Sequence, residues 1–155
     1  MPPDSRIWVY QANKELDSSS IAQINRLATV FIDDWSSHGF KMRATAEVVY
    51  NRFVIIAVDE AAASASGCGI DKSFRFIQTL ESELGITLLD RTVVAWEEEG
   101  ILKSASLSAF ENYLKEGKVG KETIVFNNLV NTKAELQQSW RVPLSQSWHA
   151  RLLKA

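Results

Sequence analysis

The residues Phe53-Val54-Ile55-Ile56-Ala57-Val58 form an unbroken apolar run in which most side chains are β-branched. Such side chains favour strands, and a strand with one face in water would alternate apolar and polar residues. A strand that is covered on both faces is apolar throughout. This run therefore predicts a central strand that is buried on both sides.

The segments on either side of this run have the patterns of further strands and helices. Residues 44–50 alternate between two faces, as in a strand, and residues 6–11 are β-branched and aromatic. The expected elements are a strand at 6–11, a helix from the serines at 18–20 to Gly39, strands at 44–50 and 53–58, a helix at 72–84 and a strand at 91–96.

The order of these elements is that of the split βαβ motif of ferredoxin-like domains. We predict an α+β fold with a mainly antiparallel sheet and helices on one face. The chain of 155 residues fits a single domain, with a ferredoxin-like βαββαβ core over 6–96 and a C-terminal extension over 100–155. A mixed three-layer α/β arrangement is the alternative, because the run at 53–58 is apolar on both faces.

The C-terminal extension contains two pairs of residues with the spacing of a capping box. Ser108 and Glu111 form the first pair, and Thr132 and Glu135 form the second. Each pair predicts the start of a short helix, and a short strand is expected between them at 123–126.

The charge and the apolar runs of the chain limit its partners. The formal net charge is −2, so no basic field is expected that would hold a nucleic acid. No apolar run approaches the roughly 20 residues that span a bilayer, and the first residues lack the pattern of a signal peptide. We therefore expect a cytoplasmic protein without membrane insertion, and a homodimer is left open.

Metal ligands are sparse in the sequence. The single cysteine, Cys68, excludes a cysteine metal cluster and an intrachain disulfide. Asp34 and His38 lie four residues apart, a spacing that can chelate a metal, but no second pair accompanies them. We predict neither a metal nor another cofactor.

The main candidate site is the segment that should connect the central strand to the second helix. It contains Ser66, Gly67, Cys68, Gly69, Asp71, Lys72 and Ser73. The start of a helix exposes unpaired N–H groups and a partial positive charge, both of which attract anions. The sequence therefore predicts a small anionic ligand at 66–73.

Each residue type in this segment suggests a role. Gly67 and Gly69 would let the backbone approach the ligand, and Lys72 would supply a positive charge. Ser66 and Ser73 would add hydroxyl groups, and Asp71 is placed to cap the helix. The arginines at the ends of the neighbouring strands could join the cluster, namely Arg52 and Arg91.

A phosphate-loop ATPase is not supported by this segment. The Walker A motif requires a glycine directly before its lysine and another glycine five residues earlier. Here Asp71 precedes Lys72, and its carboxylate would repel a triphosphate.

Short stretches along nearly the whole chain carry a family resemblance. They are Trp8–Gln11, Tyr50–Phe53, Val58–Glu60, 66–68, 70–73, Asp90-Arg91, Phe126–Val130 and Ser147–His149. Through them the chain resembles a family of short bacterial proteins that have no established activity and sometimes carry the label ABC transporter ATPase. The resemblance implies no activity or site residue.

Two other functions are kept as alternatives to an anion-binding module. In the first, Cys68 is a nucleophile whose pKa is lowered by Lys72, with His149 as its base. In the second, the protein is structural or binds a protein partner. Trp148 is the best candidate among the tryptophans for the wall of a pocket, and the side-chain amides of Asn127 and Asn128 could orient a polar ligand.

Overall fold

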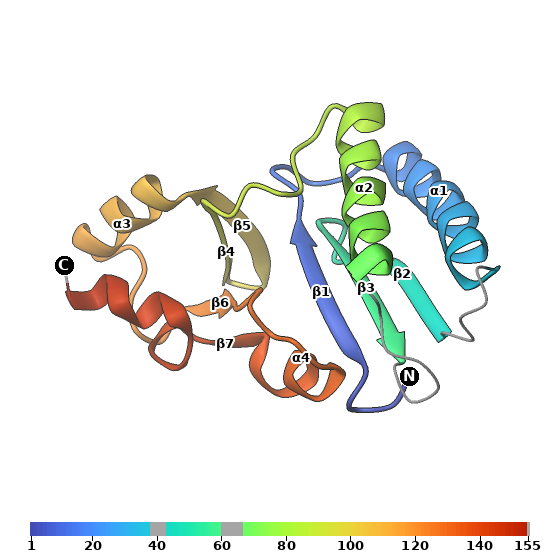
Figure 1. Ribbon diagram of the computed structural model, residues 1–155. Coiled ribbons are helices and arrows are strands. Elements are labelled where there is room, and N and C mark those ends of the chain that lie inside the picture. The colour runs from blue at the N-terminus through green and yellow to red at the C-terminus, as the bar shows by residue number, and fades with distance from the viewer. Residues whose placement is uncertain (38–42, 60–66, 155) are drawn as a thin grey trace.

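The computed structural model describes residues 1–37, 43–59 and 67–154, which form two antiparallel sheets with helices (Figure 1). The strand order is β1-β3-β2 in the first sheet and β5-β4-β6-β7 in the second. The strands are β1 (Arg6–Gln11), β2 (Arg43–Val49), β3 (Phe53–Asp59), β4 (Val93–Glu98), β5 (Ile101–Ser106), β6 (Ile124–Phe126) and β7 (Arg141–Pro143). The α+β class is confirmed, and the strand pairs of the described residues are antiparallel.

The middle strand of the first sheet, β3, is buried on both faces, as its apolar run predicts. All six residues from Phe53 to Val58 are buried. Val54, Ile56 and Val58 belong to one apolar cluster, and the alternating residues 53, 55 and 57 belong to another. Because successive side chains of a strand point to opposite faces, β3 contributes to two cores.

The first core lies between the sheet and the helices α1 (Ser18–Ser37) and α2 (Gly67–Leu84), which cover one face of it (Figure 1). Ile24 and Trp35 of α1 and Leu80 of α2 are buried there. The carboxylate of Asp17 accepts a hydrogen bond of 2.7 Å from the Ser20 backbone N–H, so Asp17 caps α1 directly before the serines at which the helix was expected to begin. Among the described helices, none is long and apolar enough to cross a membrane.

The second core joins the two sheets through aromatic side chains. The ring centroid of Phe53 lies 5.0 Å from that of Phe126 and 4.9 Å from that of Trp140. Phe126 ends β6, and Trp140 lies between α4 (Lys133–Ser139) and β7. The second sheet therefore covers the face of β3 that the helices leave open.

The ferredoxin-like arrangement is not confirmed, because the fourth strand does not join the first sheet. β4 pairs with β5 and β6. The outer edge of β1 is already bonded: the Ile7 N–H donates to the Asn131 carbonyl at 2.9 Å, and Arg6 forms a bridge with Thr132. A tight turn with positive φ at Glu99 and Gly100 instead folds β4 back onto β5 as a hairpin.

The remaining helices lie in the C-terminal part, and side-chain caps fix the start of two of them. The Ser106 hydroxyl accepts a hydrogen bond from the Ala109 N–H, so Ser106 caps α3 (Leu107–Lys115) and the prediction of Ser108 was wrong. Thr132 caps α4 by accepting from the Glu135 N–H, as the capping-box spacing predicts. Two 3₁₀ helices follow, η1 (Leu144–Gln146) and η2 (Trp148–Lys154).

We expect Phe53→Ala to lower the free energy of unfolding by about 3–5 kcal/mol, the usual cost of truncating a buried aromatic ring. The ring is fully buried, and its loss would leave Phe126 and Trp140 facing a cavity. Urea titration followed by circular dichroism measures this change. Val30→Ala is the control, because Val30 is 64% exposed and should change stability by about 0.5 kcal/mol or less. Equal effects of the two substitutions would contradict the role of Phe53.

Candidate functional site

The segment at 66–73 begins the second helix earlier than the sequence predicts. α2 starts at Gly67, so Asp71 and Lys72 lie inside the helix and Asp71 is not its N-cap. The buried Ser73 hydroxyl donates a 2.7 Å hydrogen bond to the Ile70 carbonyl. Ser66 lies outside the described residues, and of Gly67, Cys68 and Gly69 only the helical backbone is described. An anion site at this segment stays a prediction.

The structure does not bring Arg52 and Arg91 to the start of α2. Arg52 directly precedes β3, whereas α2 follows the other end of this strand, about 20 Å away at the usual strand rise. The Arg52 guanidinium donates to the Ser104 hydroxyl of β5 and thereby links the two sheets. Arg91 lies beyond the C-terminal end of α2, in the segment that leads to β4.

Cys68 and His149 are not brought together either. The first turn of α2 and the C-terminal helix η2 lie on opposite sides of the molecule, with the first sheet and the 124–143 segment between them (Figure 1). The proposed base is therefore far from the proposed nucleophile.

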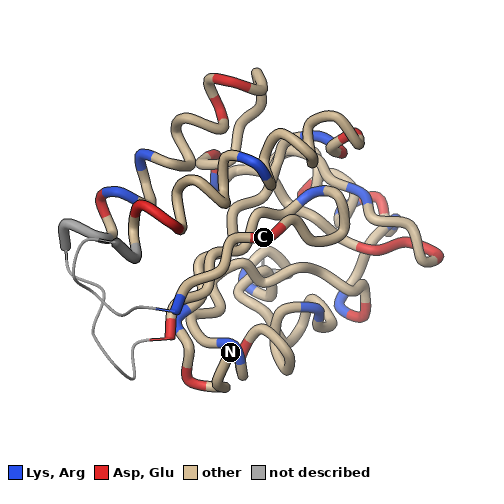
Figure 2. Tube along the Cα trace, turned by 90° about the vertical axis from the view of Figure 1, so that its right-hand side faces the viewer, with Lys and Arg blue, Asp and Glu red and all other residues tan. Residues whose placement is uncertain are grey.

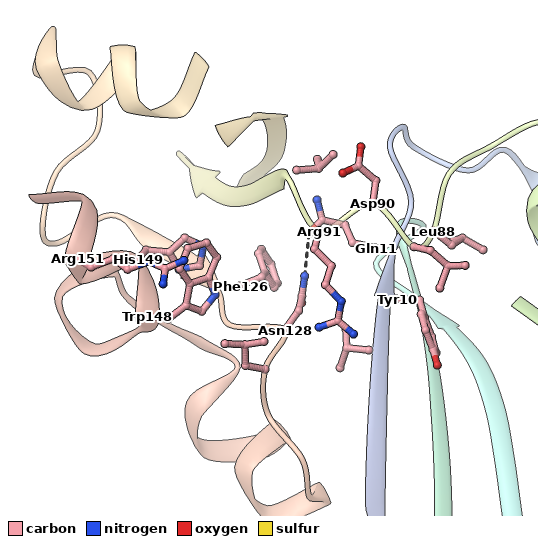
Figure 3. A pocket seen from close by; sticks show the side chains of 14 residues that line it. Tyr10, Gln11, Leu88, Asp90, Arg91, Phe126, Asn128, Trp148, His149 and Arg151 are labelled. Carbon is pink, nitrogen blue, oxygen red and sulfur yellow. Dashed lines mark hydrogen bonds between the residues drawn. The ribbon is translucent and has the colours of Figure 1, made fainter. Parts of the chain in front are cut away.

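The structure instead shows a pocket between the two sheets, with a volume of about 240 Å³ (Figure 3). Four separate parts of the chain line it: the end of β1, the segment between α2 and β4, the segment after β6, and η2. The residues with polar or aromatic side chains that line it are Tyr10, Gln11, Asp90, Arg91, Phe126, Asn128, Trp148, His149 and Arg151.

Side-chain amides form a hydrogen-bonded chain in one wall of the pocket. The Asn128 Nδ2 group donates to Gln11 Oε1 at 2.9 Å, and the Trp140 indole N–H donates to Asn128 Oδ1 at 2.9 Å. These two bonds fix the orientation of the Gln11 amide. Gln11 is 6% exposed, and its Nε2 group has no hydrogen-bond partner among the described residues. A buried donor without a partner costs about 1–3 kcal/mol, so it marks a place where an acceptor is expected.

The charged residues of the pocket carry a net charge of +1, from two arginines and one aspartate. The Asp90 carboxylate accepts from the Thr92 N–H at 2.9 Å and from the Thr92 hydroxyl at 2.6 Å, and these hydrogen bonds lower the pKa of Asp90. Arg91 and Arg151 are exposed and form no ion pair within the described part of the chain. Elsewhere along the trace, charges of both signs are interspersed (Figure 2).

Trp148, His149 and Arg151 of η2 lie together on one side of the pocket (Figure 3). The two rings stack on each other. Their ring centroids lie 3.8 Å apart in a stacked arrangement, and the Arg151 guanidinium carbon lies 4.9 Å from the Trp148 ring centroid. His149 Nδ1 shares a hydrogen bond with the Ser147 hydroxyl. Burial, with a smaller contribution from Arg151, lowers the pKa of His149 to about 4. The imidazole is therefore neutral at pH 7.

Tyr10 and the nearby arginine complete the opposite side of the pocket. Figure 3 shows the Arg91 side chain extending into the space between Asn128 and Tyr10. Burial raises the pKa of the Tyr10 phenol, and the positive charge of Arg91 partly offsets this rise. The phenol is thus a neutral group beside a positively charged one at pH 7.

Some residues of this pocket were predicted from the sequence as site residues, but Gln11 was not. Arg91 was predicted to join the 66–73 site, and His149 was predicted to act as a base for Cys68. Trp148 and Asn128 were noted as ligand candidates. Gln11 was not predicted, because its position at the end of the strand at 6–11 gives no sign of a ligand. The one available signal was that Trp8–Gln11, Asp90-Arg91, Phe126–Val130 and Ser147–His149 are all stretches that carry the family resemblance.

Comparisons with known proteins add no further assignment. No family model, curated protein or solved structure matches the chain.

Within the described residues, no group of three or more His, Cys, Asp or Glu side chains could hold a metal ion. His38, which lies four residues after Asp34, is outside these residues.

We expect the lowered pKa of His149 to make the protein less stable as the pH falls from about 6.5 to about 4. Between these values the unfolded chain binds a proton that the folded protein does not, so protonation favours unfolding. The loss should be roughly 2–3 kcal/mol over this range, at about 1.4 kcal/mol per pKa unit.

Two measurements check this prediction. The NMR titration of the imidazole should have its midpoint near pH 4, with His149→Gln identifying the signal. The same variant should show a shallower decline of unfolding free energy between pH 6.5 and pH 4. A midpoint at the ordinary value near 6.5 would show that the ring is not buried as described.

Proposed function

We propose that the protein is a small-molecule binding module whose ligand is a small organic anion held in the pocket between the two sheets. The observation that carries this proposal is the unpartnered Nε2 group of Gln11 in a pocket whose two arginines have no ion-pair partner among the described residues. This site replaces the 66–73 segment as the place where the structure best supports an anion-binding function.

The lining of the pocket suggests which parts of the ligand bind where. Arg91 and Arg151 would attract a carboxylate or a phosphate, and Gln11 Nε2 would donate to one of its oxygens after a small side-chain movement. Aliphatic side chains complete the lining, namely Val9, Leu88, Leu89, Val93 and Leu129. An apolar part of the ligand would contact them. A volume of about 240 Å³ lies just below the usual range for ligand pockets, which favours a small molecule.

Binding is favoured over covalent catalysis by what lines the pocket. The described lining contains no serine, threonine, cysteine or lysine that could act as an activated nucleophile. The Asp90 carboxylate is held by Thr92, and His149 Nδ1 is bonded to Ser147. These polar groups are therefore suited to hold a ligand.

We expect aromatic carboxylates such as benzoate to bind more tightly than benzamide, which has the same shape without the charge. Arg91→Ala should weaken benzoate binding about tenfold, the effect of losing one charge-assisted hydrogen bond at about 1.4 kcal/mol. Isothermal titration calorimetry and NMR shift mapping measure the affinity and the location. Lys72→Ala is the matched control, since it removes a positive charge from the 66–73 segment and should leave the affinity unchanged.

The opposite effects of the two substitutions on benzoate binding would contradict binding in the pocket. If Lys72→Ala weakened binding and Arg91→Ala did not, the ligand would bind at the start of α2. If neither benzoate nor inorganic phosphate shifted the NMR signals of Gln11 and Asn128, the pocket would not be an anion site.

The isosteric variant Gln11→Glu tests the amide itself. Its carboxylate would still accept from Asn128, but it would replace the unpartnered donor with a negative charge. We expect benzoate binding to fall by at least about tenfold because a donor becomes a repulsive acceptor. Unchanged affinity would show that Gln11 does not contact the ligand, and circular dichroism of the variant verifies that it remains folded.

A further inference from the structure

The two edges of the first sheet differ in how their backbone groups are bonded. At the β1 edge, the Ile7 N–H donates to Asn131, and the Lys133 N–H donates to the Ser5 carbonyl at 3.0 Å. At the other edge, the outer side of β2 has no such partner among the described residues, apart from the turn in which Val49 accepts from Arg52. Among residues 1–37, 43–59 and 67–154, β2 is therefore an edge strand whose outward donors and acceptors have no backbone partner.

β2 lacks several of the features that usually protect an edge strand. Proline, bulges, shortness and repeated lysines are the common devices. The seven residues of β2 pair with β3 in an unbroken register from Arg43 opposite Asp59 to Val49 opposite Phe53. The strand contains no proline and no lysine, and its two charged residues have opposite signs.

The side chains of β2 are divided between its two faces. Ala44, Ala46 and Val48 pack toward the helices. Arg43 and Glu47 lie two pleats apart on the other face, both are exposed, and neither forms an ion pair within the residues that the structure describes.

We propose that β2 pairs with β2 of a second copy of this chain, antiparallel and around a two-fold axis at Thr45. In this register Thr45 lies opposite Thr45, and Arg43 of each copy lies opposite Glu47 of the other. The two three-stranded sheets then form one continuous six-stranded sheet. Charge complementarity of the strand with itself identifies the occupant as a second copy.

The charges also favour this register over those centred on either charged residue. An antiparallel two-fold centred on Arg43 would place two arginines opposite each other, and one centred on Glu47 would place two glutamates opposite each other. Like charges directly opposite are destabilising in a sheet, whereas opposite charges are stabilising. Centring on Thr45 pairs both charges of each strand.

On the side of the first sheet that carries the helices, the surface next to β2 is open enough for a second strand to approach. A shallow hollow lies between α1 and β2, lined by residues that include Ala28, Thr29, Thr45 and Ala46. The small side chains that line this hollow allow the strand of a second copy to approach β2. Because a single strand pair buries less area than a standard interface, a dimer with a dissociation constant in the micromolar range is expected.

The test measures the mass of the full chain by sedimentation velocity across a concentration series. Arg43→Glu places two glutamates opposite each other at both ends of the pairing, and Glu47→Arg does the same with arginines. Each variant alone should dimerise at least about tenfold more weakly than the wild type. Lys121→Glu makes the same change of charge in the turn before β6, away from β2, and is the control.

Mixing the variants distinguishes this pairing from a general effect of charge. An equal mixture of the Arg43→Glu and Glu47→Arg chains should form a heterodimer, since opposite charges meet again at every position. The double variant Arg43→Glu, Glu47→Arg should regain the wild-type dimer.

Other outcomes overturn the proposal. A wild-type chain that stays monomeric up to millimolar concentration has no dimer at this edge. A wild-type dimer that survives Arg43→Glu uses another surface. Single variants that lose the dimer but do not form the heterodimer show that Arg43 and Glu47 do not face each other. Circular dichroism of each variant verifies that it is folded.

Discussion

The burial of β3 on both faces is the constraint on which the rest of the structure depends. One face holds the helices, and the other holds the aromatic contact of Phe53 with Phe126 and Trp140. This contact also positions the pocket, because Gln11 is the register partner of Phe53 across β1 and β3. Trp140 in turn donates its indole N–H to Asn128, which donates to Gln11. Packing and the polar wall of the pocket are thus set by the same residues.

This arrangement explains how an unfavourable group can persist in the wall of the pocket. Full burial of an aromatic side chain such as Phe53 contributes roughly 1.5–3 kcal/mol, and aromatic pairs add about 0.5–1.5 kcal/mol. An unpartnered amide donor costs about 1–3 kcal/mol. The aromatic contact therefore offsets the strain of keeping Gln11 Nε2 unsatisfied. His149 is a second group whose burial has a cost, because burial opposes protonation of its imidazole and lowers its pKa.

Local patterns predicted most elements but not every cap, since the caps expected at Ser108 and Asp71 were wrong. Competition between distant segments was not visible in the sequence at all. The burial of residues 53–58 and the cap at Thr132 follow from side chains within a few residues of each other. The position of β4 depends on whether Asn131 and Thr132 already occupy the edge of β1, which no local pattern encodes. The pocket was not predicted for the same reason: Gln11, Arg91, Asn128 and His149 come together only when two sheets pack, whereas 66–73 is a continuous motif.

The pocket and the proposed dimer edge lie on opposite sides of β3. The pocket is lined by the end of β1, and the edge is formed by β2, so pairing at β2 would leave both pockets of a dimer open. β3 is buried on both faces from Phe53 to Val58, and such a close-packed strand is expected to resist rearrangement. Coupling between two sites requires an element with two states that both sites bias. Since β3 is not such an element, ligand binding and dimerisation in this protein are expected to be energetically independent.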